Sequence, residues 1–132
     1  MFNDVDAEVV IGTIPVGDIS YSDLLIILRN NRLAALDDGH IVSITRETNI
    51  RQLPTRTIYS DDDSIDDGEF VSRVIQLENT EAKFYVPIFR PMLPQHGFMV
   101  AHAESSSLLI FDRYGNVRRI SEIIEKMDAS AK

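Results

Sequence analysis

The 132-residue chain contains no cysteine, so neither a disulfide framework nor a thiolate metal site can form. Its longest uninterrupted apolar run covers residues 24–28, far short of the roughly 20 residues that a membrane-spanning helix needs. Positive charge is also scarce, because 13 basic side chains stand against 21 acidic ones and the formal net charge is -8. Such a surface repels phosphate, which argues against nucleic-acid binding as the main function.

What the chain does contain is typical of a folded domain rather than a disordered one, with 44% apolar and 26% charged residues. The acidic excess lies in residues 1–68, which carry 13 acidic and 5 basic side chains and include five aspartates between positions 61 and 67. Because like charges at this density disfavour compaction, we interpret residues 48–68 as an acidic linker. The linker would separate two small units, residues 1–47 and 69–132.

The C-terminal unit has the clearer periodicity. Apolar alternation predicts strands over residues 71–77, 98–103 and 107–111, and apolar spacing of three and four predicts a helix over 81–93. Two prolines lie inside that helix, where an interior proline costs about 3 kcal/mol. A final helix is predicted from Asn116 as its N-cap. Its apolar stripe consists of Val117, Ile120, Ile123, Ile124 and Met127.

This order of strand, helix, strand, strand and helix predicts an α+β fold, with both helices on one face of a three-stranded sheet. The N-terminal unit repeats part of it. A strand over residues 8–14, a helix from Ser20 to about residue 31 and a hairpin of residues 33–36 and 41–44 form a β-α-β-β copy. Asp23, three residues after Ser20, indicates a capping-box start for that helix.

The sequence matches no metal-binding, hydrolase or nucleotide-binding motif. An EF-hand frame starting at Asp63 places Ile65 at a ligand position and Val74 where glutamate is required, so we predict no calcium site. The three histidines do not pair at helical spacing, and Ser105 to Ser107 beside His102 lack a G-x-S-x-G elbow. The chain also lacks a P-loop and a G-x-G-x-x-G run. We predict no catalytic, cofactor-binding or metal-binding residue and no enzymatic activity.

Four segments in order resemble the small periplasmic module that is repeated in secretins, the outer-membrane channels of bacterial secretion systems. SRVIQLEN at 72–79 is similar to the family's TRVIPLKN, and VPIFRPMLP at 86–94 to its VPVLRPLLP helix, which tolerates prolines at both places. SLLIFD at 107–112 resembles NTLIIAD, and NVRRISEII at 116–124 resembles NIERIEEII. Residues 7–45 are similar to the second half of the preceding secretin domain, so 1–47 is expected to be a partial first periplasmic domain.

The resemblance implies a non-enzymatic module, without cofactor, that forms rings in the periplasm around the vestibule of a type II secretion channel. The implied partners are further copies of the chain, an inner-membrane platform protein and exported folded proteins. A membrane would be reached only through a barrel domain that this sequence does not contain. Two alternatives stay open: a secretin of a type IV pilus or type III system, and a stand-alone KH-like binding module, although the GXXG loop of KH domains is missing.

Closure of a ring requires a head-to-tail interface between two different faces of the same module. Opposite charges on separate edges could supply complementary faces. The candidate interface residues are Arg113, Arg118, Arg119, Glu122 and Glu125.

Overall fold

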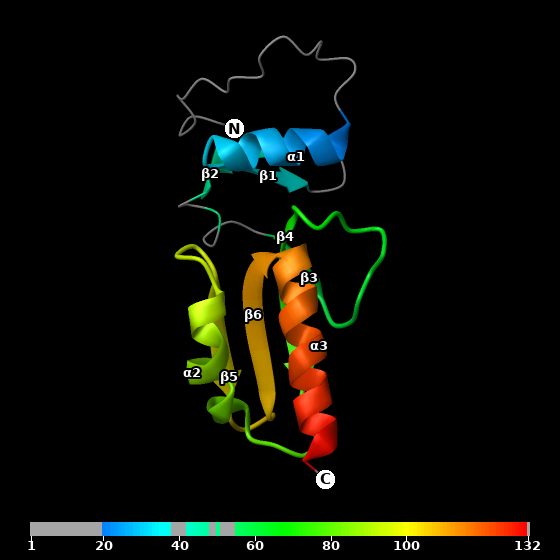
Figure 1. Ribbon diagram of the computed structural model, residues 1–132, viewed down its shortest axis with the longest axis vertical. Coiled ribbons are helices and arrows are strands. Elements are labelled where there is room, and N and C mark those ends of the chain that lie inside the picture. The colour runs from blue at the N-terminus through cyan, green and yellow to red at the C-terminus, as the bar shows by residue number, and fades with distance from the viewer. Residues whose placement is uncertain (1–19, 38–41, 48–49, 51–54, 132) are drawn as a thin grey trace.

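The computed structural model describes residues 20–37, 42–47, 50 and 55–131 (Figure 1). Helices and strands are mixed along the chain, which confirms the α+β class. In order, the elements are α1 (Tyr21–Asn30), β1 (Leu33–Asp37), β2 (Val42–Arg46), β3 (Arg56–Ile58), β4 (Phe70–Gln76), η3 (Ala82–Phe84), α2 (Val86–Phe89), η4 (Arg90–Met92), β5 (Phe98–His102), β6 (Ser107–Arg113) and α3 (Tyr114–Ser130). The predicted strand over residues 8–14 lies outside the described residues.

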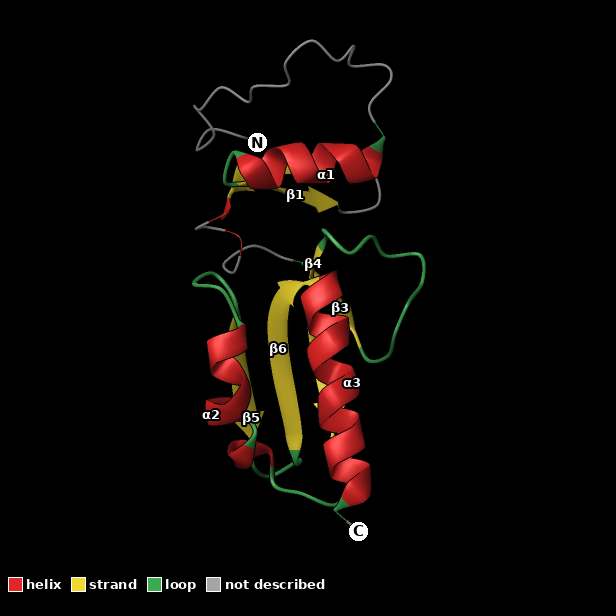
Figure 2. Cartoon of the chain, in the orientation of Figure 1, coloured by secondary structure: helices red, strands yellow, loops and turns green. Residues whose placement is uncertain are grey.

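The larger unit is a four-stranded sheet in the order β3-β4-β6-β5, with α2 and α3 on the same face (Figure 2). Strands β4 and β6 pair antiparallel over seven residue pairs, from Phe70 with Arg113 to Gln76 with Ser107. Strand β5 forms the expected antiparallel hairpin with β6. The core between the sheet and the helices contains the fully buried Ile110, Val117 and Ile120. The predicted apolar stripe of α3 therefore does pack on the sheet, although Ile123 and Met127 at its margin stay partly exposed.

The sheet has one strand more than the sequence predicts. Strand β3 pairs parallel with β4, and it lies within the segment that was interpreted as a linker. Ile58 on β3 and Ile65 in the following loop are both buried in the core of the four-stranded unit. The second half of the acidic segment is thus part of this unit rather than a free connection, because it supplies two apolar side chains among its charges.

Residues 81–93 form three short helical pieces instead of one continuous helix. Pro87 lies in the first turn of α2 and Pro91 in the first turn of η4. A proline lacks the N–H that a helix interior needs, whereas the first turn leaves its N–H groups without intrahelical partners. The prolines therefore divide the segment into short helical pieces. Each proline lies in a first turn, where the missing N–H costs the least free energy.

The start of α3 also differs from prediction. The helix begins at Tyr114, two residues before the expected N-cap Asn116. The backbone N–H groups of Tyr114 and Gly115 donate to the carbonyl oxygens of Glu69 (2.7 Å) and Asp67 (3.0 Å). Backbone carbonyl oxygens, rather than a capping side chain, therefore accept hydrogen bonds from the first N–H groups of the helix.

The N-terminal unit consists of α1 packed on the β1–β2 hairpin. Ser20 is the N-cap of α1, as predicted, and its hydroxyl oxygen accepts a hydrogen bond from the Asp23 N–H at 3.1 Å. Leu28 of α1 packs against Leu33 on one face of β1. Alternation along the strand turns Ala34 to the other face, where it packs against the four-stranded unit.

Candidate assembly surface

The five candidate interface residues lie in very different surroundings. Arg119 and Glu122 are exposed on α3, and the Arg119 guanidinium donates to the Asn116 side-chain oxygen at 2.7 Å. Arg118 and Glu125 are occupied within the chain, by Asp67 and Arg73 respectively. Arg113 is only 8% exposed, so it does not belong to an exposed charged face. Of the five, Arg119 and Glu122 are the two best placed to meet another molecule.

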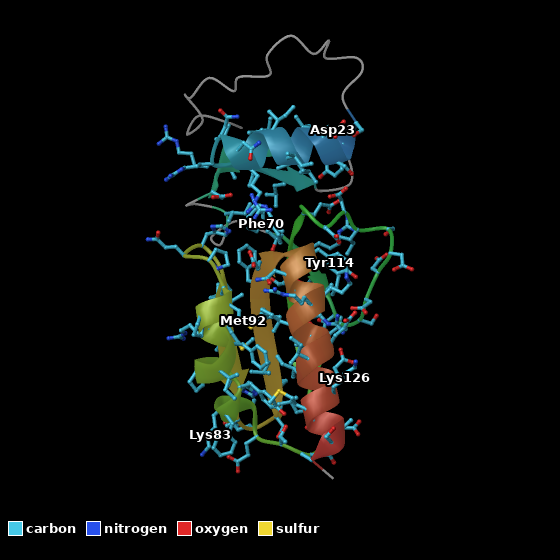
Figure 3. The ribbon with its side chains drawn as sticks, viewed as in Figure 1. Asp23, Phe70, Lys83, Met92, Tyr114 and Lys126 are labelled. Atoms are coloured by element: carbon cyan, nitrogen blue, oxygen red, sulfur yellow. The ribbon has the colours of Figure 1, made fainter. Side chains whose placement is uncertain are left out.

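Arg113 instead joins the two units of the chain. Its guanidinium donates to the Glu47 carboxylate at 2.6 Å and lies 4.4 Å from the ring centre of Phe70. Phe70 stacks on Phe111, which in turn stacks on Phe98, so three aromatic rings cross the back of the sheet. Figure 3 shows Phe70 at this junction, below the N-terminal unit. The arginine at the end of β6 thus holds the hairpin unit against the sheet.

His96 lies at the same junction between two carboxylates. Its Nδ1 is 3.7 Å from Glu47, and its Nε2 is 3.6 Å from Asp112. The ring packs edge-on against Phe70, with the ring centres 5.2 Å apart. Nε2 is buried and has no hydrogen-bond partner among the described residues.

The aspartate-rich stretch, which we call the aspartate loop (residues 60–68), is fixed to α3. Arg118 binds Asp67 with two hydrogen bonds of 2.7 and 3.2 Å, and the buried Arg73 binds Asp61. The Asp62 N–H donates to the Tyr114 hydroxyl at 2.8 Å. Sequence reasoning missed this arrangement because it treated the aspartates as mutually repelling, without the arginines that compensate them.

Within the loop, local hydrogen bonds hold the chain in place. The Ser64 hydroxyl and N–H both donate to the Asp62 carboxylate, and these two bonds hold the pKa of Asp62 below its usual range. Across the part of the chain that the structure describes, no three metal-ligating side chains gather at one point. The expectation that this is not a calcium loop stays a prediction, and the loop's order has another explanation.

The far end of α3 is tied down by Asp128. Its carboxylate accepts hydrogen bonds from the N–H groups of Glu78 (2.9 Å) and Asn79 (3.0 Å) and from the Thr80 hydroxyl (2.6 Å). Burial works to raise the pKa of Asp128, but these hydrogen bonds together lower it below its usual value. The turn after β4 is therefore locked to the last turns of the helix.

The side chains that superficially resemble a hydrolase site do not assemble into one. His102 Nδ1 is 2.7 Å from the Ser105 hydroxyl in the exposed β5–β6 turn. Asp112 lies at the other end of β6, where it is buried and accepts a hydrogen bond from Asn116 at 2.7 Å. A serine–histidine pair without an orienting carboxylate is a turn contact, not a catalytic triad.

These contacts tie the aspartate loop and the turn after β4 to α3, and exposed charges of both signs remain on the outer side of that helix. The chain is 35% identical over 57 residues to the secretin XcpQ of Pseudomonas aeruginosa, a match that covers 43% of this chain. Its relatives are secretins. This match confirms the secretin resemblance indicated by the sequence. The chain spans 9% of the length of that curated secretin, and no protein-family model matches it.

Solved secretin structures also align with the chain. A crystal structure of the N-terminal domain of XcpQ is 23% identical, with a TM-score of 0.43, and the match covers 81% of this chain and 41% of that one. A crystal structure of the GspC–GspD complex from the type II secretion system of enterotoxigenic Escherichia coli is 18% identical, also with a TM-score of 0.43. It covers 83% of this chain and 68% of that one. Within the described residues, no helix is both long and apolar enough to cross a membrane.

Proposed function

We propose that the chain is a non-enzymatic periplasmic module of an outer-membrane secretin of the type II kind, and that copies of it form a ring around the export vestibule. The observation that carries the proposal is the match to a secretin over 57 residues at 35% identity. Residues 1–47 then correspond to part of a first periplasmic domain and residues 69–132 to a second module. Folded proteins destined for export would pass through the ring.

The internal ties described above suit a ring component, because a wedge must keep its shape when neighbours press on both sides. The charges of Arg118, Arg73 and Asp128 are all engaged by contacts within the module. Arg119 and Glu122 remain on the outside of α3 for contacts with a neighbouring copy. An inner-membrane platform protein is the further partner that the secretin resemblance implies.

The test is sedimentation velocity of the purified chain at rising concentration, at low and at high salt. We expect weak self-association that salt reduces, because the proposed contacts are between exposed charges, which salt screens. Arg119→Glu should weaken the association, whereas Lys83→Glu, a reversal of an exposed charge on η3, should not. A tight two-fold dimer indifferent to salt would contradict the proposal, because a symmetric contact uses up the face that a ring needs.

A further inference from the structure

A cleft of about 890 Å³ opens where the two units meet. Its walls come from three places that are far apart in the sequence: the end of α1, the segment 92–96 after η4, and the first turns of α3. Figure 1 shows the C-terminal end of α1 above the loop that follows α2, with the start of α3 beside it. We call this the arginine cleft, because Arg29, Arg32, Arg113 and Arg119 all line it.

Each acidic side chain in the cleft has a hydrogen-bond partner. Glu47 is bound by Arg113 at 2.6 Å, and Asp67 is bound by Arg118 at 2.7 Å. Asp112 accepts a hydrogen bond of 2.7 Å from the Asn116 amide. Glu47 and Asp67 are therefore compensated by Arg113 and Arg118, whereas Asp112 is hydrogen-bonded by a neutral amide and keeps its charge.

Within the described part of the chain, three arginines of the cleft have no carboxylate partner. Among the described residues, no carboxylate pairs with Arg29 or Arg32, and both are exposed. The Arg119 guanidinium binds only the neutral amide oxygen of Asn116. Since the chain as a whole carries a net charge of -8, this local excess of positive charge goes against the general composition.

Arg32 is held in an unusual backbone conformation. Its φ of 58° lies in the left-handed region, which costs a residue with a Cβ about 1 kcal/mol or more. Two backbone hydrogen bonds of 3.0 Å fix it there, from the Arg32 N–H to the Arg29 carbonyl and from the Glu47 N–H to the Arg32 carbonyl. This place directly after a helix is where glycine is usually preferred. The structure thus carries an arginine where backbone energetics favour a smaller residue.

The rest of the cleft offers both polar and apolar contacts. The buried Nε2 of His96 has no hydrogen-bond partner among the described residues, and His96 lines the cleft. Met92, Leu93 and Pro94 add an apolar wall. A ligand that fills this space would therefore combine carboxylates with apolar groups.

We propose that the arginine cleft binds an acidic peptide segment of a partner protein, with acidic side chains on Arg29, Arg32 and Arg119 and apolar ones on the wall at 92–94. Guanidinium groups bind carboxylates with two parallel hydrogen bonds, which gives both strength and orientation. A long polyphosphate such as nucleic acid fits less well, because Met92, Leu93 and Pro94 make one wall of the cleft apolar. This inference shares Arg119 with the outer side of α3, but Arg29, Arg32 and the wall at 92–94 come from other elements, so it does not depend on ring formation.

The test uses a fluorescein-labelled decapeptide in which Asp or Glu alternates with Leu, and fluorescence polarisation with the 132-residue chain. We expect the combined variant Arg29→Gln, Arg32→Gly to bind the peptide at least tenfold more weakly. Glycine relieves the left-handed backbone at position 32, so the melting temperature of this variant should not fall below that of the wild type. The double variant Lys83→Gln, Lys126→Gln is the matched control, because it also removes two exposed positive charges, both outside the cleft, and it should change the affinity less than twofold.

Four results would overturn the proposal. The first is failure of the peptide to bind, and the second is equal affinity for the wild type and the combined variant. The third is displacement of the peptide by inorganic phosphate as readily as by the unlabelled peptide, which would make the cleft a simple anion site. The fourth is self-association that disappears in the combined variant without any peptide, which would make a second copy of the chain the occupant. An uncharged peptide with Asn and Gln in place of the acids should not bind.

Discussion

Replacing Asp128 by alanine should destabilise the protein by about 3 kcal/mol. The carboxylate accepts three hydrogen bonds, from the N–H groups of Glu78 and Asn79 and from the Thr80 hydroxyl, and the residue is 7% exposed. Hydrogen bonds to a charged group contribute about 1.5–3 kcal/mol each at best, and donors left without an acceptor add a penalty that nearby water partly relieves. Asp128→Asn keeps one acceptor oxygen and should cost about half as much.

The pH dependence gives a second readout for the same contact. Because the hydrogen bonds lower the pKa of Asp128 in the folded state, its stabilisation is fully present above the pKa of an unfolded aspartate, about 3.9, and is lost as the pH falls through the folded value. The difference in unfolding free energy between the wild type and Asp128→Asn should therefore shrink as the pH is lowered from 7 toward 3.

Urea titrations followed by circular dichroism at several pH values measure both effects through the midpoint and slope. Glu122→Ala is the matched control, because it removes an exposed carboxylate from the same helix and should change stability by less than about 0.5 kcal/mol. An unchanged urea midpoint for Asp128→Ala would refute the reasoning. So would a difference in unfolding free energy between the wild type and Asp128→Asn that stays constant with pH.

Three other changes test the packing. Ile120→Asp places an unpaired charge in the core and should unfold the four-stranded unit; unchanged thermal melting would mean that α3 does not pack as described. Tyr114→Phe removes the acceptor of the Asp62 N–H, so it should cost about 1 kcal/mol and speed proteolysis in the aspartate loop; equal cleavage rates would speak against the tie. Glu47→Ala strands the buried Arg113 guanidinium and should cost about 3 kcal/mol; a double-mutant cycle with Arg113→Ala that shows simple additivity would contradict the pairing.

Periodic segments were predictable because their signals are local. The cap at Ser20, the β5–β6 hairpin and the apolar stripe through Ile120 all follow from spacing within about ten residues, and the structure contains each of them. The positions of the prolines were also visible in the sequence, but the choice between a kinked helix and three short pieces depends on how the segment packs on the sheet.

The features that sequence reasoning missed depend on distant partners. Strand β3 has only three residues, and it becomes a strand because β4 offers its free edge. Arg113 was taken for a surface charge because its partner Glu47 lies 66 positions away. The aspartate loop was taken for a solvated linker because its compensating Arg118 lies 51 positions from Asp67. The net charge of a sequence segment does not predict whether the segment is ordered when the compensating charges come from a distant helix or strand.

The direction of the strands has a mechanical consequence. Strands β4 and β6 run along the longest axis of the molecule (Figure 1), and they are joined by a ladder of seven residue pairs. Hydrogen bonds in an antiparallel ladder lie perpendicular to the strands, so a pull along that axis loads all the rungs in shear at once instead of opening them one after another. Resistance to forced unfolding is set by the unfolding rate, and shear of a whole ladder makes that rate low. Tension applied at the two ends of the four-stranded unit would therefore be shared along its central pair of strands, whereas tension applied across the sheet would open it rung by rung.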